Sequence, residues 1–74
     1  MAQQTKNAIR RAFIQLLNER PLDKISIKDI AEKGAVNRNT FYYYYADIYA
    51  LVEDILQLEI QDFQSKLRRY DSWQ

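Results

Sequence analysis

The chain has 74 residues, of which 28% are charged, and its formal net charge is +1, so it can form one small domain at most. It contains neither cysteine nor histidine, which removes disulfide bonds, thiolate and imidazole chemistry and the usual nitrogen and sulfur metal ligands; we expect no enzyme, no metal site and no cofactor. No run of about 18 apolar residues and no secretory signal is present, which predicts a cytoplasmic protein that does not enter a membrane.

The first predicted element is a helix over about residues 5–19. The whole chain contains one glycine and one proline, so strands and hairpins are disfavoured and the fold class is predicted to be all-α. Apolar residues recur here at steps of three and four, which places them on one face of a helix: Ile9, Phe13, Leu16 and Leu17. Pro21 cannot continue this helix, because proline has no N–H group to donate.

A second helix is predicted over residues 27–33. Ser26 can cap its first turn, and Asp29, three residues later, can complete a capping box with the Ser26 backbone. Ile25 and Ile30 occupy the two positions of a hydrophobic staple. Gly34 is expected to supply the permissive backbone that ends the helix.

A third helix is predicted over residues 37–45, directly after the second. Asn37 is its expected cap, with Val36 and Phe41 as a second staple. A gap of about three residues is too short to join two antiparallel helices, so the second and third helices must cross steeply. This is the arrangement of a helix-turn-helix, and residues 1–47 are interpreted as a three-helix, homeodomain-like head.

The fourth predicted helix covers residues 48–74 and begins after Asp47, a third capping residue. One apolar stripe on it can face the head: Ile48, Leu51, Val52, Ile55 and Leu58. A second apolar stripe exceeds what a three-helix head can cover: Leu56, Ile60, Phe63, Leu67 and Tyr70. We therefore expect the chain to self-associate through residues 56–73.

Four consecutive tyrosines lie in the third predicted helix. At about 100° per residue, Tyr44 and Tyr45 lean toward the core with Phe41, whereas Tyr42 and Tyr43 cannot share that face. The outward surface then carries polar side chains that suit base edges and phosphates: Arg38, Asn39, Tyr42 and Tyr43. A purely structural role, as part of an amphipathic helix that packs on the core, is favoured for Tyr44 and Tyr45.

The charges divide along the chain. Residues 1–46 carry eight Lys or Arg and four Asp or Glu, whereas residues 47–74 carry three and six. A polyanion should therefore approach the half that contains the turn motif. Such a split is also common on solvated helices, so it supports the motif without establishing it.

Residues 5–58 resemble the N-terminal DNA-binding domain of the TetR family of bacterial transcription regulators. The resemblance is most specific over IAEKGAVNRNTFYYYYADIYALVEDI, which begins at Ile30. The small, apolar, hydroxyl and aromatic positions of the family pattern are all present: Ala31, Val36, Thr40, Phe41, Tyr42, Tyr45 and Leu51. Within the family, the stretch NRNTFYYYYADIY is most similar to regulators related to the activator of dihydroxyacetone kinase genes.

The resemblance implies a set of residues that bind double-stranded DNA. Arg38, Asn39 and Tyr43 would face the bases. The phosphates would be bound by side chains of the second and third helices and the residue before the second: Ser26, Lys28, Thr40, Tyr42 and Tyr44.

Three positions depart from the family pattern. The glycine that usually precedes the turn valine is replaced by Ala35, with Gly34 one step earlier, which leaves the turn geometry open. A lysine that usually meets a phosphate is replaced by Ile48, although N–H groups at that helix start can still receive a phosphate. The usual histidine is replaced by Tyr44, whose phenol can also donate to a phosphate.

The predicted function is sequence-specific DNA binding by a homodimer on a roughly palindromic operator, with residues 37–45 in the major groove. The resemblance also implies a larger helical domain after the fourth helix, which would bind a small-molecule effector and form the dimer. Because the sequence ends at Gln74, we interpret the chain as a fragment or as the product of a truncated gene.

Other functions are weaker interpretations of the same residues. The main alternative is a helical protein-interaction module with an exposed Tyr and Arg surface. A helix lying on a membrane surface is disfavoured by the even balance of charges. An enzyme would have to depend on carboxylates such as Glu59 and Asp62, which are interpreted as solvated surface.

Overall fold

Three α-helices and one 3-10 helix form a head, and a long fourth α-helix protrudes from it, in the part of the chain that the structure describes. The computed structural model describes residues 2–72, and side chains are described for residues 3–68. Its elements in chain order are α1 (Ala2–Glu19), the 3-10 helix η1 (Leu22–Lys24), α2 (Ile27–Lys33), α3 (Arg38–Tyr44) and α4 (Ile48–Ser72). Residues 2–72 contain no β-strand, and the all-α prediction, with a helix-turn-helix head and a long fourth helix, is confirmed.

The structure differs from the sequence-based expectation at the start of α1 and after Pro21, and α3 is one residue shorter at each end than expected. Helix α1 begins at Ala2, about one turn earlier than expected, because the residues before Thr5 include good helix formers and none that stops a helix. After Pro21 the chain forms η1, which the apolar pattern did not indicate; the N–H group of Lys24 donates to the carbonyl of Pro21 over 2.9 Å.

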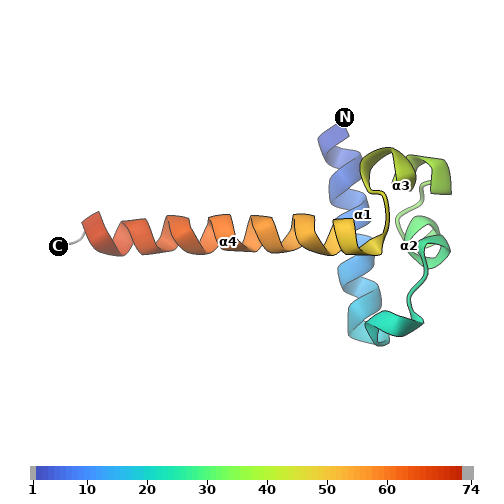
Figure 1. Cartoon of the computed structure of the whole chain (residues 1–74), viewed down its shortest axis with the longest axis horizontal. Coiled ribbons are helices and arrows are strands. Elements are labelled where there is room, and N and C mark those ends of the chain that lie inside the picture. Colours follow the sequence, from blue (N-terminus) through green and yellow to red (C-terminus); the bar gives the residue numbers. More distant parts are fainter. Residues whose placement is uncertain (1, 73–74) are drawn as a thin grey trace.

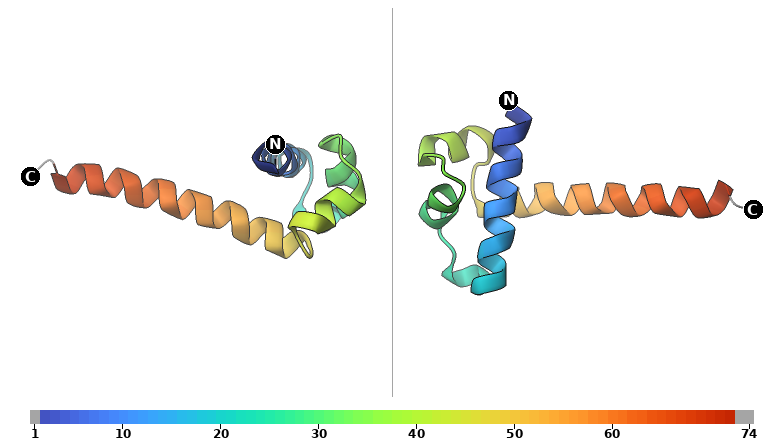
Figure 2. Two further views of the ribbon diagram at one scale, coloured as in Figure 1. Left: turned by 90° about the horizontal axis from the view of Figure 1, so that it is seen from above. Right: turned by 180° about the vertical axis from the view of Figure 1, so that it is seen from behind.

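Helix α4 crosses α1 and then extends away from the head (Figure 1), and a second viewing direction shows the same separation (Figure 2). The first part of α4 therefore packs on the head, whereas its second part has none of the head beside it. Leu51 is fully buried, whereas Leu58, the last residue of the stripe expected to face the head, is 43% exposed.

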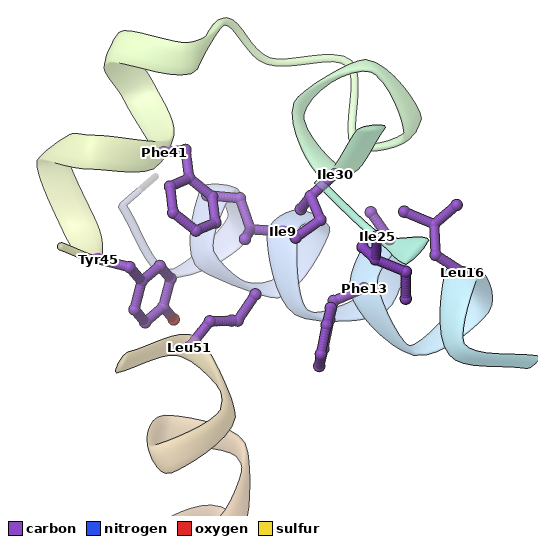
Figure 3. Close-up of a cluster of buried hydrophobic side chains, with 9 residues drawn as sticks. Ile9, Phe13, Leu16, Ile25, Ile30, Phe41, Tyr45 and Leu51 are labelled. Atoms are coloured by element: carbon purple, nitrogen blue, oxygen red, sulfur yellow. The ribbon is translucent and has the colours of Figure 1, made fainter. Parts of the chain in front are cut away.

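The core joins all four α-helices. Figure 3 shows apolar side chains from α1, α2, α3 and α4 meeting in one cluster. Its largest fully buried members come one from each helix: Ile9, Ile30, Phe41 and Leu51. Burying a side chain of this size stabilises the fold by about 1.5–3 kcal/mol, so the short α2 and α3 are held mainly by packing. Leu17, expected on the apolar face of α1, is 42% exposed and lies outside the buried core.

Helix α2 begins as its local sequence predicts. The Ser26 Oγ atom accepts from the Asp29 N–H over 3.1 Å, and the Ser26 N–H donates to the Asp29 carboxylate over 3.0 Å. This is a complete capping box. The expected staple residues Ile25 and Ile30 are both buried in the core.

The turn between α2 and α3 corrects the role assigned to Gly34. Gly34 has right-handed backbone angles (φ −85°), and the left-handed residue is Ala35 (φ 58°). The N–H group of Val36 donates to the Ala31 carbonyl over 2.9 Å, and that of Ala35 donates to the Glu32 carbonyl over 3.2 Å, which together form a Schellman motif. Ala35 thus occupies the position that usually takes glycine.

Gly34 serves close packing instead of an unusual backbone angle. A Cβ atom at this position would lie 3.4 Å from the carbonyl oxygen of Ala8 and 3.3 Å from that of Ile30. A side chain here would therefore push the end of α2 away from α1.

Candidate nucleic-acid interface

Helix α3 presents one face to the core and the other to solvent. Phe41 is fully buried and Tyr45 nearly so, whereas Tyr43 is 81% exposed and Tyr42 is also exposed. Arg38 and Asn39 are exposed on the same outward side. The prediction that Tyr42 and Tyr43 face outward while Tyr44 and Tyr45 lean toward the core is therefore confirmed; Tyr44 is half-buried against the core.

The exposed tyrosines are held by neighbouring rings. The rings of Tyr43 and Tyr44 meet edge-on with their centroids 4.9 Å apart, and Tyr42 meets Phe41 in the same way at 5.8 Å. Such contacts between aromatic rings stabilise a pair by about 0.5–1.5 kcal/mol beyond the burial of area. Tyr42 and Tyr43 are thereby restrained before any ligand is bound.

The cap of α3 engages the hydroxyl group of Thr40. The Asn37 Oδ1 atom accepts from the Thr40 N–H over 2.8 Å and from the Thr40 hydroxyl over 3.0 Å. A hydroxyl group has one hydrogen to donate, so a phosphate that received it would replace the bond to Asn37. The N–H bond of the cap would remain.

Ser26 and Lys28 lie at the start of α2, and both are exposed. The Ser26 Oγ atom acts as an acceptor in the capping box, so its own hydrogen can point outward to a phosphate. The hydrogen bond from the Ser26 backbone N–H, more than any other contact, holds the pKa of the Asp29 carboxyl below its ordinary value. Arg20 lies 3.3 Å from this carboxylate and offsets its charge, which would otherwise repel a phosphate.

The beginning of α4 has an apolar residue that packs on the core where the family pattern has a charged lysine. Ile48, which stands where the family pattern has a lysine, is half-buried and packs against the core. The Asp47 carboxylate accepts from the Ala50 N–H over 2.9 Å, so this N–H group is already satisfied. An approaching phosphate would find a capped helix start here.

A polar cluster behind α3 was not anticipated from the sequence. The Asp54 Oδ2 atom accepts from the Tyr45 hydroxyl over 2.6 Å and lies 2.8 Å from Arg10 Nη1, which itself lies 3.4 Å from the Tyr45 hydroxyl. Arg10 also donates to the Asn7 side chain, and the Lys6 ammonium lies 5.8 Å from the centre of the Tyr45 ring. The cluster joins α1, the residue that ends α3, and α4.

The protonation of this cluster follows from burial and from its hydrogen bonds. Burial and the neighbouring Asp54 carboxylate raise the pKa of Tyr45 to about 12. The hydrogen bond from Tyr45, followed by that from Arg10, holds the pKa of Asp54 below its ordinary value, against the effect of burial. Two signals could have indicated the cluster: a buried Tyr hydroxyl needs a partner, and Asp54 interrupts the apolar stripe three residues after Leu51.

Among the described residues, no helix is both long and apolar enough to cross a membrane. The residues expected to meet DNA come from two places in the fold: Arg38, Asn39, Thr40, Tyr42, Tyr43 and Tyr44 belong to α3, whereas Ser26 and Lys28 belong to the start of α2.

Comparison with known proteins gives matches over most of the chain. The sequence model of the family described as "Bacterial regulatory proteins, tetR family" matches residues 9–55. The chain is 33% identical over 57 residues to the "Uncharacterized HTH-type transcriptional regulator YxbF" of Bacillus subtilis (strain 168), covering 77% of this chain and 15% of that protein. It is 39% identical over 49 residues to the "Uncharacterized HTH-type transcriptional regulator YvdT" of the same organism, covering 66% of this chain and 25% of that protein.

The matched part of the chain thus spans a quarter or less of these curated relatives. No solved structure matches the chain.

Proposed function

Because the chain belongs to the TetR family of bacterial regulatory proteins, we propose that it binds specific sequences of double-stranded DNA by placing α3 in the major groove. One observation supports this proposal most: α3 turns Phe41 fully into the core while it exposes a row of hydrogen-bonding side chains on its other face. A recognition helix needs both faces. The protein would act as a transcription regulator in the bacterial cytoplasm and not as an enzyme.

The base contacts are assigned to the exposed residues that lie on α3. The Arg38 guanidinium can bind the O6 and N7 atoms of guanine together, and the Asn39 amide can bind adenine in the same bidentate manner. Tyr43 is the most exposed of the described tyrosines in α3 and can reach a base edge or a thymine methyl group.

The phosphate contacts are assigned to residues that flank these positions. Lys28 supplies a charge, Ser26 and Thr40 supply hydroxyl groups, and Tyr42 and Tyr44 supply phenols. Phosphate contacts position a protein on DNA without reading its sequence. The half-buried Tyr44 would contribute only its hydroxyl end.

Two copies of the head would read the two halves of a roughly palindromic operator. A small-molecule effector would bind only to a part of the regulator beyond α4, since the curated relatives are at least four times as long as the regions that match.

Selection from a pool of random duplexes, followed by titration of the enriched sequence at several salt concentrations, tests the proposal. We expect enrichment of a palindrome, amide NMR shifts at α3 and the start of α2, and an affinity that falls steeply as salt rises. The second candidate function, a protein-interaction module, is favoured by the exposed Tyr42 and Tyr43. A failure of every duplex to shift α3 resonances at low salt would reject DNA binding and leave this second candidate.

A further inference from the structure

We propose that Asp54 is a positioning residue for the reading of bases. By accepting a hydrogen bond from the Tyr45 hydroxyl, it fixes the last part of α3, which carries Tyr43, without touching DNA itself. The inference rests on the proposed function, because it concerns how α3 reads a base pair. It adds a residue of α4, outside the helix-turn-helix, to those that determine the base preference.

The two ends of α3 are held in different ways. At its beginning, the Asn37 side chain accepts from the Thr40 N–H over 2.8 Å, and the preceding turn is closed by hydrogen bonds to α2. At its end, Tyr45 leaves the helix with an extended backbone (φ −137°), and its hydroxyl reaches Asp54 of α4. The beginning is therefore fixed by local contacts, whereas the end is fixed by a contact with a distant helix.

The direction in which Tyr45 lies is set by its hydroxyl group. Its ring packs on Phe41 with the centroids 5.7 Å apart, and Figure 3 shows the hydroxyl oxygen on the side of the ring nearest α4. Apolar contacts have no preferred direction, so packing alone would let the ring slide. The 2.6 Å bond to the Asp54 carboxylate is directional and prevents this.

Asp54 is itself held in place. Its Oδ2 atom lies 2.8 Å from Nη1 of Arg10, whose side chain is only 10% exposed and also donates to Asn7 of α1. The hydrogen bond from Tyr45 keeps the pKa of Asp54 below its ordinary value, so at neutral pH the group is a carboxylate, which accepts and cannot donate. The single hydrogen of the Tyr45 hydroxyl is therefore committed to Asp54.

Tyr45 acts on DNA only through its neighbours. It is 4% exposed, and its hydrogen is already used, so it cannot bind a phosphate or a base. Tyr43, two residues earlier, is 81% exposed, and its ring meets that of Tyr44 edge-on at 4.9 Å. A displacement of Tyr45 is thus transmitted to Tyr43 through the backbone and through Tyr44.

The displacement should be unequal along α3. Phe41 is fully buried in the middle of the helix and resists movement there. Arg38 lies three residues before Phe41, beside the cap, whereas Tyr43 lies two residues after it. Loss of the bond to Asp54 should therefore displace Tyr43 more than Arg38. A mere change of charge would act on all sequences alike, because electrostatic attraction to phosphates does not depend on the sequence.

Affinities of the wild type and Asp54→Ala for duplexes with single base-pair changes test the proposal, at a temperature where circular dichroism shows both proteins folded. The base pairs read by Tyr43 and by Arg38 are those whose preference Tyr43→Ala and Arg38→Ala remove. A well-read base pair contributes about 5- to 150-fold in affinity, and Asp54→Ala should lower the preference at the Tyr43 base pair by about five-fold or more. The preference at the Arg38 base pair should persist. Equal loss at both base pairs, or no loss at either, would overturn the proposal.

Two variants separate the hydrogen bond from the charge. Glu53→Ala removes the same charge from an exposed neighbouring position and should leave both preferences intact. Asp54→Asn keeps an oxygen that can accept from Tyr45 and should restore most of the preference at the Tyr43 base pair. An asparagine variant as defective as Asp54→Ala would contradict the role of the hydrogen bond.

Tyr45→Phe tests the same bond from its other side. It keeps the aromatic ring in the core, so the fold should survive, but it removes the hydroxyl and should reproduce the loss seen in Asp54→Ala. The double variant should lose no more preference than either single variant, because both remove one shared interaction. Additive losses would mean that Asp54 and Tyr45 act separately and would refute the positioning role.

Residual dipolar couplings of the free protein keep the proposal distinct from DNA binding. In Asp54→Ala, the backbone N–H directions should change at residues 42–45 and stay as in the wild type at residues 38–40. Unchanged couplings at residues 42–45 would overturn the positioning role even if the wild type reads a specific sequence. If the wild type binds no duplex, or Tyr43→Ala alters no base preference, the contacts under the proposed function are rejected. The couplings then decide by themselves whether Asp54 holds the end of α3.

Discussion

The Tyr45 hydroxyl donates to the Asp54 carboxylate over 2.6 Å, across the junction between the end of α3 and the middle of the part of α4 that packs on the head. The same carboxylate oxygen lies 2.8 Å from Arg10 of α1. Helix α3 has seven residues, too few to be stable alone, so this one oxygen helps to fix the end of α3 against α1 and α4.

Replacing Asp54 with alanine is expected to lower the free energy of unfolding by about 2 kcal/mol, because the mostly buried Arg10 and Tyr45 both lose their acceptor. Chemical denaturation measures this loss. Glu53→Ala removes the same charge from an exposed neighbour and should change stability by less than about 0.5 kcal/mol. Equal effects of the two substitutions would mean that the cluster does not contribute to the fold.

Acid should destabilise the protein partly through Asp54. Its pKa in the folded protein lies below the ordinary value of 3.8 because of the hydrogen bond from Tyr45. A group with a lowered pKa contributes stability that is fully present above the unfolded value and is lost as the pH falls through the folded value. Unfolding measured below pH 3.8 should therefore show a flatter pH dependence in Asp54→Asn than in the wild type. Parallel curves would contradict the lowered pKa.

Alkali should ionise Tyr45 late. Burial and the Asp54 carboxylate raise the pKa of its phenol to about 12, so the stability from the neutral phenol is present below its ordinary value of 10.0 and declines as the pH rises toward 12. An ultraviolet absorbance titration should show a component near pH 12 that Tyr45→Phe removes. Tyr43→Phe, a change at an exposed position, should leave that component in place.

Ala35 should be better replaced by glycine. Its left-handed backbone (φ 58°) costs an L-residue about 1 kcal/mol, which glycine avoids. Ala35→Gly is therefore expected to raise the midpoint of thermal unfolding by about 4 °C, allowing for the extra entropy of glycine in the unfolded chain.

Gly34→Ala provides the matched control for that turn. The backbone of Gly34 suits alanine, but the added Cβ would meet the carbonyl oxygens of Ile30 and Ala8 at 3.3 and 3.4 Å. It should lower the midpoint. Destabilisation by Ala35→Gly as well as by Gly34→Ala would place the left-handed residue at Gly34 instead.

The elements that the sequence predicted are those governed by local rules. Ser26 with Asp29, and Asn37 with Thr40, form caps between residues three apart. The period of 3.6 residues per turn places Tyr43 on the exposed face and Tyr45 on the buried face. Each of these relationships is contained within one turn of helix. The fold class and the outward face of α3 could therefore be predicted.

What the sequence did not predict depends on contacts between distant segments or on small differences in backbone energy. Arg10 and Asp54 are 44 residues apart, and only the crossing of α1 and α4 brings them together. The left-handed residue is Ala35 although the neighbouring Gly34 has the greater freedom, because the space beside α1 leaves Gly34 no room for a side chain. Packing between helices decided both outcomes.

The assigned contacts to bases and to phosphates predict different behaviour for Arg38 and Lys28. Arg38→Ala should cost about 1–3 kcal/mol on the preferred duplex and relax the preference at one base pair. Lys28→Ala should weaken all duplexes alike and reduce the salt dependence of binding by about one phosphate contact. Affinities for a panel of duplexes with single base-pair changes, each at several salt concentrations, distinguish the two patterns.

Arg68→Ala is the control, because it removes a similar charge from the exposed far part of α4; it should change neither the base preference nor the salt dependence of binding. If Arg38→Ala weakened every duplex equally, the Arg38 side chain would be binding a phosphate. The base contacts would then be left to Asn39 and Tyr43.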